Sequence, residues 1–221
     1  MKQENNLRLQ KISEFVQNYL EESYQGRSRK DKADLNRYLS NAEYRWKHTL
    51  RVAQFGKVIA DNEATDVELI VAACLLHDVA WFDTNAENSR EHGRTGASKA
   101  RPLLESLGYE KAQVDNICYS IASHVDEENP DTLEARILSD ADNVDRFGQY
   151  RILQWCFSDI NNYDRLAAKL SERILRLEHY REVNPLFTST GQQLFIEQLS
   201  LQIRFFSEFV GEKELSVMPR I

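Results

Sequence analysis

The chain has 221 residues, of which 42% are hydrophobic and 29% charged, a composition typical of one sizeable globular domain. The formal net charge of −7 argues against a general binder of nucleic acids or anionic membranes, because such proteins need a basic face. No apolar run approaches the roughly 18 residues of a membrane span and the N-terminus has no apolar signal-peptide core, so we expect a cytoplasmic protein.

Two helices are predicted in the first sixty residues. The apolar positions of residues 5–24 recur at helical spacing and predict a packing helix, whereas the polar, basic residues 25–33 predict a loop. Residues 42–61 form the second helix, in which His48 lies on the apolar face. A single inward histidine is more often a hydrogen-bonded core residue than a ligand, so His48 alone decides nothing.

An apolar helix that begins at a cap, Thr65 or Asp66, ends in His77 and Asp78. Histidine is the commonest metal ligand, and a neighbouring carboxylate adds charge for a harder cation. The alternative is a capped helix end, with the histidine hydrogen-bonded in the core and the aspartate exposed. For an isolated His-Asp pair this alternative is favoured.

The next two predicted helices each carry a histidine at one end. His92 opens a helix that stops at Gly108, with Pro102 as a candidate kink or break. His124 closes a second helix over residues 110–124. Both histidines therefore lie at helix ends, as His77 does.

The predicted helix over residues 131–147 contains Asp140, Asp142 and Asp145. Three aspartates within six helical positions repel one another. Asp142 lies four positions after Leu138 of the apolar face, so it borders the buried side of the helix. A buried carboxylate is costly unless it is paired or bound to a metal, which makes this segment a candidate site.

Two more helices are predicted at residues 149–181 and 188–211, separated at Asn184–Pro185. His179 lies in a charged stretch of the first and is expected to be exposed and inert. The chain shows no internal repeat, no convincing strand pattern and no second domain boundary. The predicted fold class is therefore all-α, with residues 1–221 as a single domain.

Four of the five histidines are thus predicted to share one interior with Asp78 and Asp142. In this order and these helical contexts, the residues resemble the HD superfamily of metal-dependent phosphohydrolases. The resemblance covers about residues 44–148 and implies an HD-domain helical bundle with additional helices at 1–40 and 149–221. It is carried by the segments His48-Thr49-Leu50-Arg51-Val52, Leu75-Leu76-His77-Asp78-Val79 and Leu138-Ser139-Asp140-Ala141-Asp142.

The segments around His92 and His124 resemble small bacterial HD hydrolases that act on nucleotides. In relatives these two positions contact the phosphate or bind a second metal, so a dinuclear site is an alternative to the mononuclear site expected first. Such ligands suit a divalent ion, Mn, Fe, Co, Ni, Zn or Mg. The metal ligands implied by the resemblance are His48, His77, Asp78 and Asp142.

The resemblance also suggests which residues act on the substrate. Asp78, His92 and His124 are the candidate catalytic residues, and His92, His124 and Arg51 are candidates for holding the substrate's phosphates, because guanidinium matches phosphate oxygens. Arg94 is a second candidate clamp, or it pairs with a surface glutamate. Some HD nucleotidases orient the attacking water with a further acidic residue, for which Asp83 is a candidate at an unmatched spacing.

We therefore expect a metal-dependent phosphohydrolase that cleaves a phosphoester or phosphoanhydride bond of a nucleotide or a related small molecule. The alternative is a non-catalytic HD-type sensor of nucleotide or metal that regulates a partner. A third interpretation is a helical scaffold, which requires four buried polar residues to be satisfied without a metal at about 1–3 kcal/mol each. The expected partner is a small phosphorylated substrate rather than nucleic acid or membrane, and assembly into a homo-oligomer is left open.

Overall fold

The computed structural model of the chain describes residues 2–37, 40–84, 91–125, 129–157 and 159–216. Every regular element in these residues is helical, which confirms the all-α prediction. The elements are α1 (Lys2–Gln25), α2 (Arg29–Arg37), α3 (Ala42–Asn62), α4 (Val67–Leu76), the 3₁₀ turn η1 (Trp81–Asp83), α5 (His92–Ser106), α6 (Lys111–Ser123), α7 (Leu133–Arg146), α8 (Gln149–Phe157), α9 (Tyr163–Val183) and α10 (Ser189–Leu215). None of the described helices is long and apolar enough to cross a membrane.

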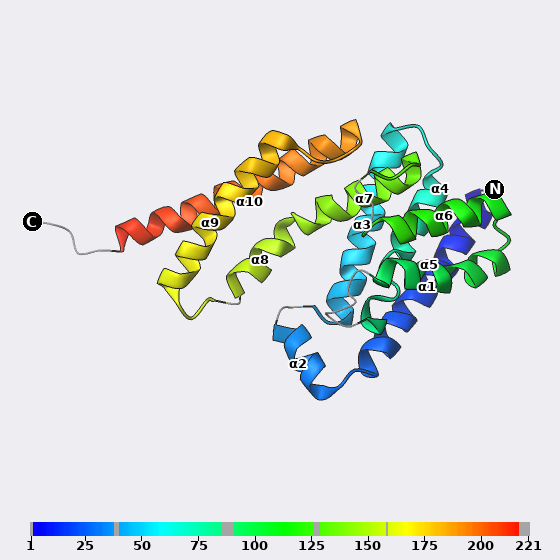
Figure 1. The fold of residues 1–221 in the computed structure, drawn as a ribbon, viewed down its shortest axis with the longest axis horizontal. Coiled ribbons are helices and arrows are strands. Elements are labelled where there is room, and N and C mark those ends of the chain that lie inside the picture. The colour runs from blue at the N-terminus through cyan, green and yellow to red at the C-terminus, as the bar shows by residue number, and fades with distance from the viewer. Residues whose placement is uncertain (1, 38–39, 85–90, 126–128, 158, 217–221) are drawn as a thin grey trace, which may run out of the picture.

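The molecule is elongated, with α1 to α7 at one end and the antiparallel pair α9 and α10 towards the other (Figure 1). Helix α7 connects the two parts, because it packs against α3, α4 and α6 on one side and against α10 on the other. Helix α8 continues from α7 after a short bend (Figure 1).

The first hydrophobic core surrounds α4, whose sequence Val-Glu-Leu-Ile-Val-Ala-Ala-Cys-Leu-Leu is almost entirely apolar. Asp66 caps this helix through hydrogen bonds from the amides of Glu68 and Leu69, as predicted. Helix α3 packs closely on α4 at Gly56, where a Cβ atom would lie 2.5 Å from Cys74 Sγ. This close packing brings His48 of α3 to the C-terminal end of α4.

The second core lies among α7, α8, α9 and α10 and contains ten buried residues, including Phe195 and Phe206. Phe55 and Leu194 pack against both cores, so the two are continuous. Gln202 of α10 is fully buried and donates from Nε2 to the carbonyl oxygens of Phe147 and Gly148. These bonds fix the bend between α7 and α8.

Several predicted helix boundaries were wrong. Residues 29–33, predicted as part of a loop over residues 25–33, belong to α2. Helix α5 runs from His92 to Ser106 as predicted, and Pro102 does not break it. The predicted helix at 149–181 is two helices, because Asn162 caps a new start at Tyr163 through a hydrogen bond from Arg165 N. The break at Asn184 is confirmed, since this residue adopts a left-handed conformation with φ 34°.

Candidate metal centre

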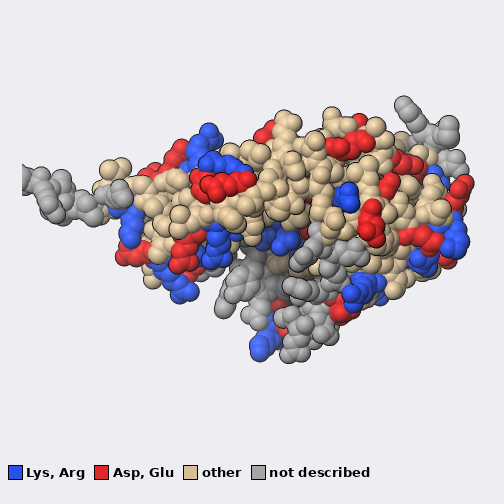
Figure 2. Space-filling view, turned by 45° about the horizontal axis from the view of Figure 1, so that its top comes forward, with Lys and Arg blue, Asp and Glu red and all other residues tan. Residues whose placement is uncertain are grey.

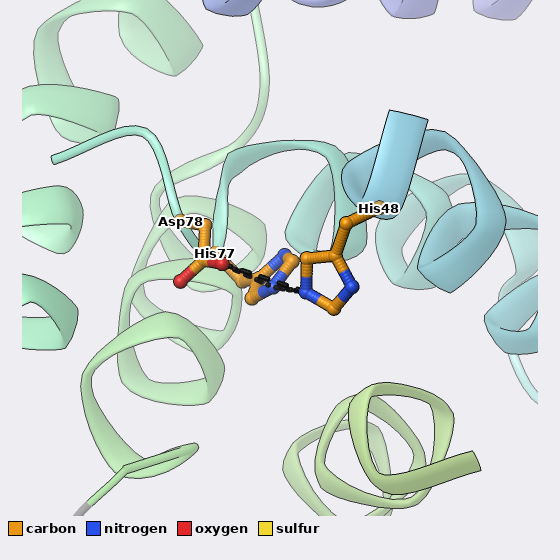
Figure 3. Close-up of side chains that lie close together, drawn as sticks. All are labelled: His48, His77 and Asp78. Atoms are coloured by element: carbon orange, nitrogen blue, oxygen red, sulfur yellow. Dashed lines mark hydrogen bonds and ion pairs between the residues drawn. The ribbon is translucent and has the colours of Figure 1, made fainter. Parts of the chain in front are cut away.

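Three helices deliver the predicted ligands to one buried point. His48 comes from α3, His77 and Asp78 follow the last residue of α4, and Asp142 comes from α7. Figure 3 shows the side chains of His48, His77 and Asp78 pointing toward one another. Both histidines and Asp78 are at most 2% exposed, so the group is shielded from bulk water.

The distances within this group match those between neighbouring metal ligands. His48 Nε2 lies 3.3 Å from His77 Nε2, 3.5 Å from Asp78 Oδ2 and 3.2 Å from Asp142 Oδ1. His77 Nε2 lies 3.3 Å from Asp78 Oδ2. Ligand atoms about 2.1 Å from one ion and at right angles to each other are about 3 Å apart, so this spacing is slightly expanded.

The hydrogen bonds of the rings show which nitrogens are available. His77 Nδ1 donates to the carbonyl oxygen of Cys74 at 2.7 Å, and His48 Nδ1 lies 2.6 Å from Asp145 Oδ2. Each partner is an acceptor, so both Nδ1 atoms carry a proton and the Nε2 atom of each ring faces the cluster. Two ring nitrogens and two carboxylates therefore converge on one point, an arrangement that fits a cation bound between them.

A second group of potential ligands shares Asp78 with the first. Asp78 Oδ1 lies 3.1 Å from His92 Nε2 and 3.8 Å from His124 Nε2, and the two ring nitrogens are 3.3 Å apart. His124 Nδ1 contacts the carbonyl oxygen of Ile121 at 2.6 Å, which again leaves Nε2 available. The predicted convergence of four histidines is therefore confirmed, while His179 is exposed on α9, as expected.

The local charges favour the protonation states that metal ligands need. Burial disfavours ionised carboxylates, but the charges of His77 and Arg45 hold the pKa of Asp78 well below its usual range. The hydrogen bond with His48 likewise outweighs burial and lowers the pKa of Asp142. Burial lowers the pKa of His124, so this ring is neutral near pH 7.

The pKa of His48 shifts in the opposite direction to that of His124, because three aspartates surround His48. Burial favours its neutral form, but hydrogen bonds to Asp142, Asp145 and Asp78 raise the pKa of His48 well above its usual value. Without a metal, a proton on this ring therefore balances the carboxylates. A divalent ion would balance the same charges, so the donor set fits such an ion.

Arg45 lies next to the cluster, although it was not among the predicted site residues. Its Nη1 atom lies 2.5 Å from Asp78 Oδ2, and its guanidinium packs 3.6 Å from the ring centre of Trp81. The side chain is buried, so it holds Asp78 firmly. Its position three residues before His48 in a helix was the available signal, since this spacing places both on one face.

The other predicted polar residues have defined partners. Arg51 donates from Nε to Asp145 Oδ1 at 2.6 Å and from Nη2 to Oδ2 at 3.1 Å, so its guanidinium supports the residue that orients His48. Asp83 accepts from the Tyr19 hydroxyl and pairs with Lys99, away from the cluster. Arg94 is exposed and lies 3.6 Å from Glu91, which corresponds to the surface pairing considered for it.

The cluster opens into a cavity of about 440 Å³, within the usual size range of small-molecule sites. Its walls include Trp81, His92 and His124, with Asp78 and Asp142 as the carboxylates among the described lining residues. Arg146 and Arg151 also line it, and neither was predicted. The bend after α7 brings Arg151 of α8 into the same wall as Asp142.

Residues 45–146 match the family model of the HD domain. This segment of the chain is an HD domain. The matched segment is almost the one that the sequence motifs cover, and it contains all the predicted metal-binding positions. HD domains bind divalent metal ions, and the histidine and aspartate groups described above could hold one.

Curated relatives with this domain include ribonuclease Y of Borrelia garinii subsp. bavariensis, 30% identical over 128 residues. The match covers 57% of this chain and 22% of that protein, so the chain matches about a fifth of its relative.

Solved structures extend the similarity of fold beyond the HD domain. A predicted HD-superfamily hydrolase from an uncultured Thermotogales bacterium has a TM-score of 0.60 at 24% identity, covering 90% of this chain and 92% of its own. YpgQ of Bacillus subtilis has a TM-score of 0.66 at 18% identity, covering 97% of this chain and 100% of its own. YpgQ in complex with ADP has a TM-score of 0.56 at 20% identity, covering 77% of this chain and 89% of its own. Helices outside residues 45–146 are therefore part of a fold that these proteins share.

Proposed function

We propose that the chain is a divalent-metal-dependent phosphohydrolase that cleaves a phosphoester or phosphoanhydride bond of a nucleotide or a related small phosphorylated molecule. The observation that carries the proposal is the convergence of two histidine nitrogens and two carboxylates, with His48 Nε2 between 3.2 and 3.5 Å from the other three residues. The residues that would hold the ion are His48, His77, Asp78 and Asp142.

An ion bound there supplies Lewis-acid polarisation of a phosphoryl oxygen and makes a water molecule more acidic. The chain itself supplies the surroundings of the reaction. Arg45 fixes the Asp78 carboxylate, and Asp145 fixes the His48 ring through its Nδ1 atom. His124 presents an unprotonated Nε2 in the cavity wall, so it can accept a proton from a water molecule there.

A nucleotide substrate is supported by the cavity size and by the relatives. YpgQ has been crystallised with ADP, and ribonuclease Y is named for action on RNA. A small nucleotide is favoured over RNA here, because the net charge is −7 and Figure 2 shows acidic and basic side chains interspersed over the face drawn.

The test combines metal analysis with a substrate screen. Protein purified without chelator is analysed for metal per chain, then assayed for phosphate or pyrophosphate release from nucleotides, and for cleavage of an RNA oligonucleotide, with Mn²⁺, Co²⁺, Ni²⁺ or Mg²⁺. We expect bound metal and turnover on a nucleotide, both abolished by Asp142→Asn and by His77→Gln. The control Asp61→Asn alters an exposed carboxylate paired with Lys57 and should change neither.

Each other outcome has a definite meaning. Metal without turnover on any nucleotide would favour the sensor alternative, and cleavage of RNA alone would replace the substrate class. A variant at Asp142 that keeps both metal and activity would refute the ligand assignment. About two metals per chain would add His92 and His124 to the ligand set.

A further inference from the structure

Arginines outnumber carboxylates among the described residues that line the cavity. Three arginines line it, Arg45, Arg146 and Arg151, against the carboxylates Asp78 and Asp142 among the described lining residues. This excess occurs in a chain of net charge −7. The cavity is therefore a local site for an anion.

Two of these arginines have no anionic partner among the residues that the structure describes. Arg45 is paired with Asp78, but no carboxylate of the described residues lies within salt-bridge distance of Arg146 or Arg151. Arg151 donates from Nε to the backbone carbonyl oxygen of Arg146 at 3.1 Å, which orients its guanidinium next to that residue. Two guanidinium groups thus line one cavity without a directly paired carboxylate in the described part of the chain.

The surroundings of Arg151 make this arrangement costly without a ligand. Burial lowers the pKa of Arg151 and outweighs the opposing effects of Tyr44 and Asp142, while the nearby charges of Arg146 and Arg45 lower it further. In addition, Nε of Arg45 is buried without a hydrogen-bond partner among the described residues. An anion in the cavity would relieve the repulsion and could accept from these unused donors.

The charge balance indicates the size of that anion. A divalent ion would cancel the charges of Asp78 and Asp142, which leaves three guanidinium charges in the cavity. One phosphate monoester supplies about two negative charges at pH 7. A second phosphate group supplies the remaining charge, and bidentate contacts to arginine are a preferred way to bind it.

We propose that Arg146 and Arg151 form a second phosphate subsite, which makes the substrate a molecule with a diphosphate or longer phosphate chain. In this arrangement one phosphate group lies at the histidine and aspartate cluster and another lies between the two arginines. The inference rests on the proposed function for the identity of the first subsite. Arg146 and Arg151 are positioning residues, because they hold the phosphate chain away from the reacting group.

The test measures binding of inorganic phosphate and inorganic pyrophosphate by isothermal titration calorimetry, with the full chain loaded with Mn²⁺. We expect pyrophosphate to bind the wild type more tightly than phosphate. Arg151→Gln and Arg146→Gln should each weaken pyrophosphate binding about ten- to a hundred-fold and change phosphate binding less than about three-fold. Arg94→Gln, which alters an exposed arginine outside the cavity, is the matched control and should change neither affinity.

Arg151→Lys keeps the charge and should recover part of the pyrophosphate affinity, which a merely structural role would not predict. Unchanged pyrophosphate binding in both glutamine variants would overturn the subsite, as would an equal loss for both ligands. So would a wild type that binds the two ligands equally.

The two proposals can fail separately. Selective loss of pyrophosphate affinity in a protein without hydrolytic activity would support the subsite and refute the hydrolase. Hydrolysis of nucleoside monophosphates alone, with kcat and KM unaffected in Arg151→Gln, would support the hydrolase and refute the subsite. If the subsite is correct, this variant raises KM for nucleoside di- or triphosphates at least about ten-fold and leaves kcat nearly unchanged.

Discussion

The three aspartates of α7 have different surroundings although they lie within six positions of one helix. Asp142 faces His48 Nε2, and Asp145 contacts His48 Nδ1 from the other side of the ring. Asp140 points away from both and accepts hydrogen bonds at the start of α10. The repulsion expected among them is therefore reduced, because each carboxylate has donors of its own.

Asp145 orients a ligand, so its charge should affect metal affinity. Asp145→Asn keeps the shape of the side chain but loses the negative charge that holds the Nδ1 proton of His48 and the Arg51 guanidinium. We expect metal affinity to fall about 10- to 100-fold, as for other residues that support a ligating histidine. Competition with a chromophoric chelator measures the affinity.

Asp115→Asn serves as the control for this change. Asp115 lies on the surface of α6 with Arg101 and Lys111 as partners, so its variant should bind metal normally. Equal metal affinity in the Asp145 and Asp115 variants would show that Asp145 has only a structural role.

The residues of the centre were predictable where the chemistry is local in sequence. His77 and Asp78 follow an apolar helix, and His48, His92 and Asp142 each lie at a helical position that faces a core. The arginines of the cavity were not among the predicted site residues. Spacing places Arg45 near His48, but only the packing of α3 and α8 shows that Arg45 and Arg151 line the cavity.

The helices, too, were predicted well only where the signal is local in the sequence. Apolar periodicity predicted α1, α3 and α4 closely, because each buries one face or all of its surface. The break between α8 and α9 was missed, although Asp159 and Asn162 lie within it and both residue types favour caps over helix interiors. An apolar pattern continues on both sides of this break, so periodicity alone merged the two helices.

At the scale of elements, Asp140 joins α7 to the start of α10. Its Oδ1 accepts from the Phe187 amide, and its Oδ2 accepts from both the amide and the hydroxyl of Thr188 at 2.8 and 2.7 Å. Thr188 is also the N-cap of α10. Asp140→Ala leaves these donors buried without a partner, so we expect a loss of about 3 kcal/mol in the free energy of unfolding.

Urea unfolding followed by far-ultraviolet circular dichroism measures this loss. Asp164→Ala, which removes an exposed carboxylate paired with Lys213 on α10, should change the unfolding free energy by less than about 0.5 kcal/mol. If both variants unfold at the same urea concentration, Asp140 contributes nothing to the attachment of α10.

The contact between α3 and α4 depends on the absence of a side chain at Gly56. Gly56→Ala places a Cβ atom 2.5 Å from Cys74 Sγ and 3.1 Å from Ile70 Cγ2, in a fully buried contact. We expect about 1–3 kcal/mol of destabilisation, despite the better helix propensity of alanine.

Gly211→Ala is the matched change in an open environment. A Cβ atom at Gly211 of α10 has nothing within 4 Å, so this variant should be more stable by up to about 1 kcal/mol. The two variants should therefore shift the urea midpoint in opposite directions, and a shift of the same sign would refute the packing argument.

At the scale of the whole molecule, the two hydrophobic cores share Phe55 and Leu194 and are joined by α7. We therefore expect residues 1–221 to unfold as one cooperative unit, as the single predicted domain requires. Hydrogen exchange measured by mass spectrometry in increasing urea should show α9 and α10 losing protection together with α3 and α4. Earlier exchange of α9 and α10 would show a separate C-terminal unit.

The position of Trp81 gives the cavity an optical signal of its own. Its indole packs on the Arg45 guanidinium and lies 4.8 Å, centre to centre, from the His92 ring, while Trp46 and Trp155 belong to the two hydrophobic cores. With the latter two replaced by phenylalanine, fluorescence would arise from the cavity wall alone. Occupancy of the site by an ion or a ligand would then be followed in real time, without a labelled substrate and before any product is known.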